Sequence, residues 1–95
     1  MTALGIAVGF NKQEMVKLLI EKGADVMLVD GKQNTVLHYA AGYGRMEVAQ
    51  ILIEAGADMD AKNDQKQTPL DVAKLNKEKT VADYLVQAWK AKSKK

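Results

Sequence analysis

The sequence predicts an all-α solenoid of about three helix-turn-helix units, each 33 residues long, with hairpin loops between them. A threonine that is followed two places later by leucine recurs at this spacing, at Thr2, Thr35 and Thr68. Alanine and leucine recur at the same spacing, at Ala7, Ala40, Ala73, Leu19, Leu52 and Leu85. A fixed period of this length indicates stacked repeats, in which each unit buries an apolar face against its neighbour.

Each unit is expected to begin with a short inner helix. Thr35 can cap a helix over residues 36–41, because its hydroxyl can accept a hydrogen bond from a free N–H of the first turn. In the last unit Thr68 takes the same place, and Pro69 follows at the first helical position, where its fixed φ favours the helix.

A second, outer helix is expected over residues 14–22 and again over residues 47–55. Apolar side chains recur there with the i, i+3, i+4 spacing of one buried helix face, at Met15, Leu18, Leu19, Val48, Ile51 and Leu52. Gly23 and Gly56 stand where a residue with left-handed backbone would end each helix. The polar segments 24–34 and 57–67 are predicted to form the hairpin loops.

The third unit departs from this pattern, because no Gly-Ala-Asp follows its outer helix, where the sequence reads Ala88-Trp89-Lys90. Its helix is expected to run on toward the C-terminal lysines, and the unit to act as a C-terminal cap. We place the repeats of this single domain, 1–95, at about 2–34, 35–67 and 68–90, with a basic tail at 91–95.

The first unit begins without a preceding hairpin and is expected to expose apolar surface. It would then belong to a longer protein, or would bury that face in a partner or a second copy.

The composition excludes several classes of protein. Without cysteine there is no disulfide framework, thiolate metal site or cysteine nucleophile. The longest aliphatic run, residues 26–29, is far shorter than the ~20 residues that span a bilayer, so we expect neither a membrane span nor a secretion signal. The charge is uneven: residues 1–67 hold 7 Lys and Arg against 9 Asp and Glu, and residues 68–95 hold 7 against 3. We expect a cytoplasmic protein that meets a membrane only peripherally.

The repeated motifs resemble the ankyrin-repeat family over essentially the whole chain. The family pattern T-x-L-H-x-A-A is present from Thr35 to Ala41, and its Gly-Ala-Asp ending follows both outer helices, at Gly23 and Gly56. In this family the histidine, here His38, usually makes hydrogen bonds between neighbouring repeats. The resemblance therefore implies a structural role for His38.

No catalytic, metal or cofactor site is predicted. His38 is the sole histidine and has no serine, cysteine or metal-ligating residue at a useful spacing. Carboxylates such as Asp58 and Asp60 fall in an expected loop, not in a cleft where an acid and a base could have unequal environments. Residues 42–44 lack the spacing and the preceding strand of a phosphate-binding glycine loop. We expect a protein that is not an enzyme.

Tyr43 and Arg45 lie where the middle unit turns from its inner to its outer helix, so both side chains are expected to be exposed and close together. A guanidinium suits phosphate, and a tyrosine hydroxyl beside it can add a hydrogen bond. The alternative is that they are ordinary turn residues. The pair is unique to the middle unit, since its equivalents are Phe10 and Lys12 in the first, and Asn76 and Glu78 in the third.

Trp89 also has two interpretations. It can cover apolar surface that no further repeat covers, or it can anchor the protein at a membrane interface. The lysines that follow it are either a solvated tail or auxiliary membrane contacts, each adding about 1 kcal/mol near an anionic surface. They are Lys90, Lys92, Lys94 and Lys95.

Residues 34–45, with residues 70–76 one repeat on, are similar to the C-terminal ankyrin domain of plant and algal cytosolic factors. Those factors escort membrane proteins to the chloroplast outer envelope, and their repeats recognise envelope lipids. The resemblance implies that Tyr43 and Arg45, which match the family's Tyr-Gly-Arg motif, bind the head group of phosphatidylglycerol. The family's galactolipid-binding residues lie on an earlier repeat, so none is assigned here.

Two other functions compete with lipid recognition. A generic ankyrin adaptor would bind a protein partner along the inner helices and loop tips, with no lipid role. Nucleic-acid binding is suggested only by the basic tail, and the acidic body and the lack of a recognition motif argue against it.

Overall fold

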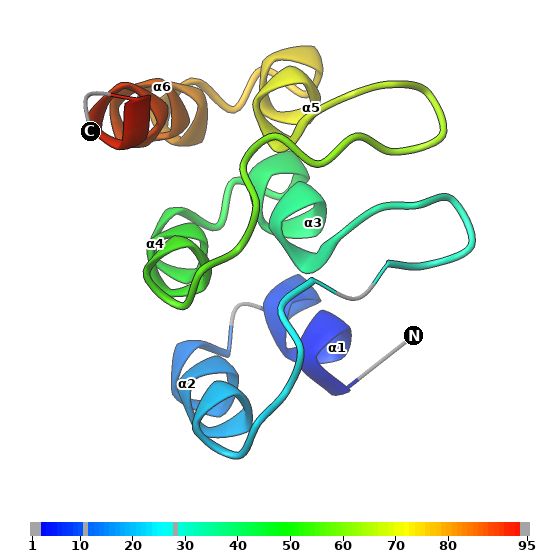
Figure 1. The fold of residues 1–95 in the computed structure, drawn as a ribbon, viewed down its shortest axis with the longest axis vertical. Coiled ribbons are helices and arrows are strands. Elements are labelled where there is room, and N and C mark those ends of the chain that lie inside the picture. Colours follow the sequence, from blue (N-terminus) through cyan, green and yellow to red (C-terminus); the bar gives the residue numbers. More distant parts are fainter. Residues whose placement is uncertain (1–2, 11, 28, 94–95) are drawn as a thin grey trace.

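The computed structural model describes residues 3–10, 12–27 and 29–93, and these residues form six helices (Figure 1). They are α1 (Ala3–Gly9), α2 (Gln13–Glu21), α3 (Val36–Gly42), α4 (Met46–Glu54), α5 (Pro69–Leu75) and α6 (Lys79–Ser93). The inner helices α1, α3 and α5 stack in one layer and the outer helices α2, α4 and α6 in a second. The predicted all-α repeat solenoid is confirmed. Thr2, Lys94 and Lys95 lie outside the described residues.

Two inner helices begin with a reciprocal cap. The Thr35 hydroxyl accepts a hydrogen bond from the N–H of His38, and the His38 ring accepts one from the N–H of Thr35. At α5 the Thr68 hydroxyl accepts from the N–H of Asp71, whose carboxylate accepts from the N–H of Thr68. Pro69 is buried at the start of α5. These bonds satisfy N–H groups that a helix start otherwise leaves without partners.

The outer helices α2 and α4 end at glycines with left-handed backbone. Gly23 has φ +94° and Gly56 has φ +97°. The following N–H groups bond back across the last turn, from Ala24 to the Leu19 carbonyl at 2.9 Å and from Ala57 to the Leu52 carbonyl at 3.0 Å. This is the Schellman arrangement, and it turns the chain sharply back over the helix pair.

Two hairpin loops project from the side of the inner helices (Figure 1). The left-handed residue in each is not a glycine: Gln33 has φ 63° and Lys66 has φ 61°, whereas Gly31 does not have positive φ. The loops bond to each other, from the N–H of Asp64 to the Lys32 carbonyl at 2.9 Å and between the side-chain amides of Asn63 and Asn34 at 2.9 Å.

The two ends of the stack differ in how they cover the core. Met15 on α2 is 48% exposed, whereas Val48 and Val81, its equivalents one and two repeats on, are 0% and 1% exposed. The first unit therefore exposes apolar surface. At the other end α6 extends for 15 residues against nine in α4, so Lys92, which we expect in the tail, is helical.

Candidate functional site

The inner helices and the loops enclose a partly apolar hollow. A groove of about 210 Å³ lies where α3 faces α5, and its lining includes Tyr39, Tyr43, Val72 and Asn76. It adjoins a second groove of about 420 Å³ between the hairpin loops and α5, because Asn34, Val72 and Asn76 line both. We call this the inner-helix face. Leu75, which lines the larger groove, is 67% exposed. Phe10, the residue after α1, is 72% exposed.

Tyr39 fixes the first loop against α3. Its hydroxyl donates a hydrogen bond to the Asp30 carboxylate. Partial burial acts to raise the pKa of Asp30, but bonds from the Tyr39 hydroxyl and from the N–H groups of Asn34 and Lys32 outweigh it and lower that pKa. The same bond, together with burial, raises the pKa of Tyr39. The loop is thus tied to the helix by a neutral phenol and an ionised carboxylate.

Tyr43 and Arg45 extend this arrangement toward the first repeat. The Tyr43 ring stacks on Tyr39, with centroids 6.2 Å apart and planes at 20°, and the Arg45 guanidinium carbon lies 6.0 Å from the Tyr43 centroid. Arg45 Nη2 donates to the Gly9 carbonyl at 3.2 Å. The structure therefore brings the two side chains together.

The expected exposure holds for Tyr43, which is 53% exposed, but not for Arg45. Arg45 is half-buried, and its Nε atom is buried without a hydrogen-bond partner among the described residues. The reason is the Gly9 carbonyl, which ends α1 one repeat earlier and draws the guanidinium inward. The other terminal nitrogen, Nη1, takes no part in this bond.

Gly44 sets the turn that holds the pair. It has φ +69°, and a Cβ at this position would clash with the Glu78 carboxylate. Asp30 and Tyr39 were not predicted from the sequence as supports for Tyr43, and Gly44 was not predicted to set the turn. A Tyr-Gly-Arg turn between two helices was the available signal for Gly44. No sequence signal pairs Asp30 with Tyr39.

His38 joins two repeats through both ring nitrogens. It is 2% exposed, Nδ1 accepts from the Thr35 N–H at 3.0 Å, and Nε2 donates to the Gln67 carbonyl at 2.8 Å. A backbone N–H can only donate and a carbonyl can only accept, so the proton is on Nε2. Neither nitrogen is free to act as a base.

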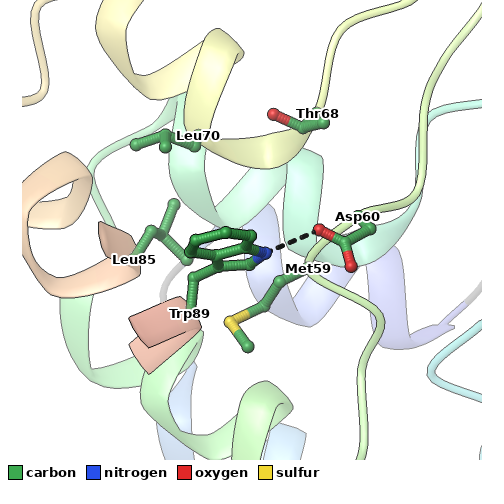
Figure 2. A pocket seen from close by; sticks show the side chains of 6 residues that line it. All are labelled: Met59, Asp60, Thr68, Leu70, Leu85 and Trp89. Carbon is green, nitrogen blue, oxygen red and sulfur yellow. Dashed lines mark hydrogen bonds between the residues drawn. The ribbon is translucent and has the colours of Figure 1, made fainter. Parts of the chain in front are cut away.

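Trp89 lies apart from this site, near the end of α6. Its Nε1–H donates to Asp60 Oδ1 at 3.0 Å, and its ring is 48% exposed beside a groove of about 270 Å³ (Figure 2). Lys90, the next residue, is exposed, and Lys92 lies near the helix end. Among the described residues, no hydrogen bond or ring contact connects Trp89 with Tyr43 or Arg45.

Two further features of the described residues bear on function. They contain no group of three or more side chains suited to hold a metal ion, and no helix with the length and apolar character needed to cross a bilayer.

Residues 4–95 match the family model of ankyrin repeats, which describes three copies. No curated protein matches the chain.

Proposed function

The chain belongs to the ankyrin-repeat family, and we propose that it is the lipid-recognising module of a cytosolic factor that delivers membrane proteins to the chloroplast outer envelope. Repeats of this family are in general non-enzymatic modules that bind protein partners. Binding without catalysis, and without a cofactor, is the corresponding proposal for this chain. The lipid ligand is the anionic head group of phosphatidylglycerol, bound by Tyr43 and Arg45.

One observation carries the proposal: a guanidinium is held beside an exposed phenol at the edge of the inner-helix face. Arg45 is anchored by the Gly9 carbonyl and by the Tyr43 ring, so little side-chain freedom is lost when a ligand binds. Its Nη1 donors and the Tyr43 hydroxyl suit the oxygens of one phosphate. Both groups would act as donors to the same anion.

The uneven charge supports peripheral membrane contact. Residues 68–95 carry 7 Lys and Arg against 3 Asp and Glu, a formal charge of +4. Such a region is attracted to an anionic leaflet over about a Debye length, ~8–10 Å at physiological salt. Lys90, Lys92 and Trp89 would add to binding without selecting the head group.

Lipid binding is tested by flotation with phosphatidylcholine vesicles that contain or lack phosphatidylglycerol. The variant Arg45→Gln removes the charge but keeps an amide donor for the Gly9 carbonyl. We expect it to lower binding to phosphatidylglycerol vesicles about tenfold, the effect of losing a charge-assisted hydrogen bond. Tyr43→Phe should lower binding by a smaller factor.

Lys17→Gln is the matched control, because Lys17 is exposed on α2 and the charge change is the same. A general surface attraction would weaken both variants equally, by the ~1 kcal/mol of one charge. Equal flotation of the two variants would therefore refute the head-group site.

A protein ligand on the same face is the second candidate, because Leu75 exposes apolar surface in one of the inner-helix grooves. Apolar anchors of this kind are typical of protein interfaces. In that case Leu75→Ser would abolish partner binding while leaving vesicle flotation unchanged. Self-association through the exposed Met15 and Leu18 of the first unit is a separate proposal, and a sedimentation coefficient independent of concentration would refute it.

A further inference from the structure

Another apolar groove lies beside Trp89 (Figure 2), and it shares no lining residue with the two grooves of the inner-helix face. Its volume is about 270 Å³, and its lining residues are Met59, Asp60, Thr68, Leu70, Leu85 and Trp89. They come from α5, from α6 and from the segment after α4. The volume is below the ~300–1,000 Å³ of pockets for drug-sized ligands, so it suits one or two side chains.

The groove exists because α6 does not end where the other outer helices end. Trp89 stands one repeat after Gly56, at which the chain leaves α4 and turns back over the helix pair. That returning segment is buried in the middle repeat, where Ala57 is 5% and Met59 is 8% exposed. The third repeat continues as helix to Ser93 and supplies no such segment.

A comparison of equivalent residues supports this origin. Leu37 in the middle repeat is 0% exposed, whereas Leu70, its equivalent in the third, is only partly buried and lines the groove. Trp89 covers part of the space and is itself half-exposed. The groove is thus the place that a returning segment, with a small side chain at Ala57 and a long apolar one at Met59, occupies one repeat earlier.

We propose that this groove binds a short segment of a partner polypeptide that carries an aliphatic side chain followed by lysine or arginine. The aliphatic group would lie on Met59, Leu70 and Leu85, against the Trp89 ring. Met59 is the model for this group, because its own side chain is buried in the core of the middle repeat. The pattern within the chain, in which Ala57 and Met59 lie in such a segment, identifies the shape of the occupant.

The charge at one edge selects the neighbouring residue. Asp60 Oδ1 accepts the indole N–H, and its second oxygen takes no hydrogen bond from the described residues. Asp58 lies beside it, with its carboxylate bonded to the Asp60 N–H at 2.8 Å. The Asp60 carboxylate at the N–H edge of the indole, with the Asp58 carboxylate next to it, favours a cation through charge.

Trp89 is the sole tryptophan, so its indole N–H resonance and its fluorescence report on this groove alone. The probe is the peptide acetyl-Ala-Gly-Leu-Lys-Gly-amide, titrated into the full chain, because its alanine and leucine have the spacing of Ala57 and Met59. We expect saturable shifts of both signals. Peptides with serine in place of leucine, or glutamate in place of lysine, should bind about tenfold or more weakly, because each removes the apolar or the charged contact.

Three variants locate the binding. Leu70→Gln should abolish the peptide-induced shift, and Asp60→Asn should remove the preference for lysine while keeping an acceptor for the indole. Leu75→Gln is the control on the same helix, since Leu75 is exposed and lines a different groove. The affinity of Leu75→Gln for the peptide should equal that of the wild type, and circular dichroism checks that all three variants are folded.

Other occupants give different results, and each would overturn the proposal. Equal shifts from the leucine and serine peptides would show that the groove does not recognise an aliphatic group. A Trp89 emission shift caused by phosphatidylglycerol vesicles but not by the peptide would assign this ring to the membrane. A shift that follows protein concentration alone would assign the groove to a second copy.

Discussion

At the scale of single residues, His38 makes the most connections. His38→Ala removes the acceptor for the Thr35 N–H and the donor to the Gln67 carbonyl, and it leaves a cavity at a site only 2% exposed. We expect the free energy of unfolding to fall by about 2–4 kcal/mol, measured by urea denaturation.

Two conservative variants divide that effect. Asparagine can place an acceptor near Nδ1, and glutamine can place a donor near Nε2, so His38→Asn should retain the cap and His38→Gln the bond between repeats. Each should lose less stability than His38→Ala. If all three variants were as stable as the wild type, the proposed structural role would be wrong.

Asp30 predicts how stability depends on pH. Burial opposes the charged form, but the hydrogen bonds from Tyr39 and the loop N–H groups lower the pKa of Asp30 in the folded chain below the ~3.9 of an unfolded one. A lowered folded pKa means that the unfolded state binds the proton more readily. The stabilisation is therefore complete above about pH 4 and is lost as the pH falls further.

The variant Asp30→Asn should thus show a smaller loss of unfolding free energy between pH 5 and acid than the wild type does. Urea denaturation at a series of pH values measures this. Asp83→Asn, at an exposed carboxylate on α6, is the control and should follow the wild-type curve. If the unfolding free energy of Asp30→Asn depended on pH as strongly as that of the wild type, the hydrogen bond from Tyr39 would not be the cause of the pH dependence.

At the scale of elements, the turns between helices depend on particular glycines. Gly44→Ala should destabilise the protein by about 1–2 kcal/mol, because φ +69° is unfavourable for a residue with a Cβ. It should also weaken vesicle binding, since the turn positions Tyr43 and Arg45. Thermal unfolding and flotation measure the two effects.

Gly31→Ala is the matched control for that turn. Gly31 does not have positive φ, and a Cβ there would meet no atom within 4 Å. It should be neutral or slightly stabilising. Adding Glu78→Ala to Gly44→Ala should restore little of the lost stability. The end of the Glu78 side chain can already move away from the new Cβ, whereas the backbone strain at residue 44 stays.

At the scale of the whole molecule, three repeats are near the minimum for a stable stack. Much of the stabilising free energy comes from the interfaces between neighbouring repeats. We expect one cooperative unfolding transition. Leu85→Ala, at a side chain 2% exposed in the third repeat, should lower the midpoint seen by circular dichroism and by Trp89 fluorescence by the same amount. Two separate midpoints would mean that the third repeat unfolds alone.

The fold was predictable from the sequence because its information is local and repeated. The caps, the apolar spacing of the outer helices and the terminal glycines lie within single units, and a 33-residue period lets each copy support the same assignment. The extension of α6 also followed from a local fact, the absence of Gly-Ala-Asp near Trp89.

The candidate sites were predictable only in part, because their geometry depends on contacts between units that are not repeated. Arg45 bonds to Gly9, 36 residues earlier, and Trp89 to Asp60, 29 residues earlier. Neither partner is chemically distinctive in the sequence, since one is a backbone carbonyl and the other a loop aspartate.

The sequence by itself determined that the chain is a stack of helix pairs, that Thr35 and Thr68 cap inner helices, and that Tyr43 and Arg45 belong to the middle unit alone. The tertiary structure decided that Arg45 is half-buried and anchored, that Asp30 and Tyr39 support Tyr43, and that a groove remains beside Trp89. The physical reason is that a period specifies which surfaces meet, whereas the side chains that differ between copies specify what those surfaces can bind.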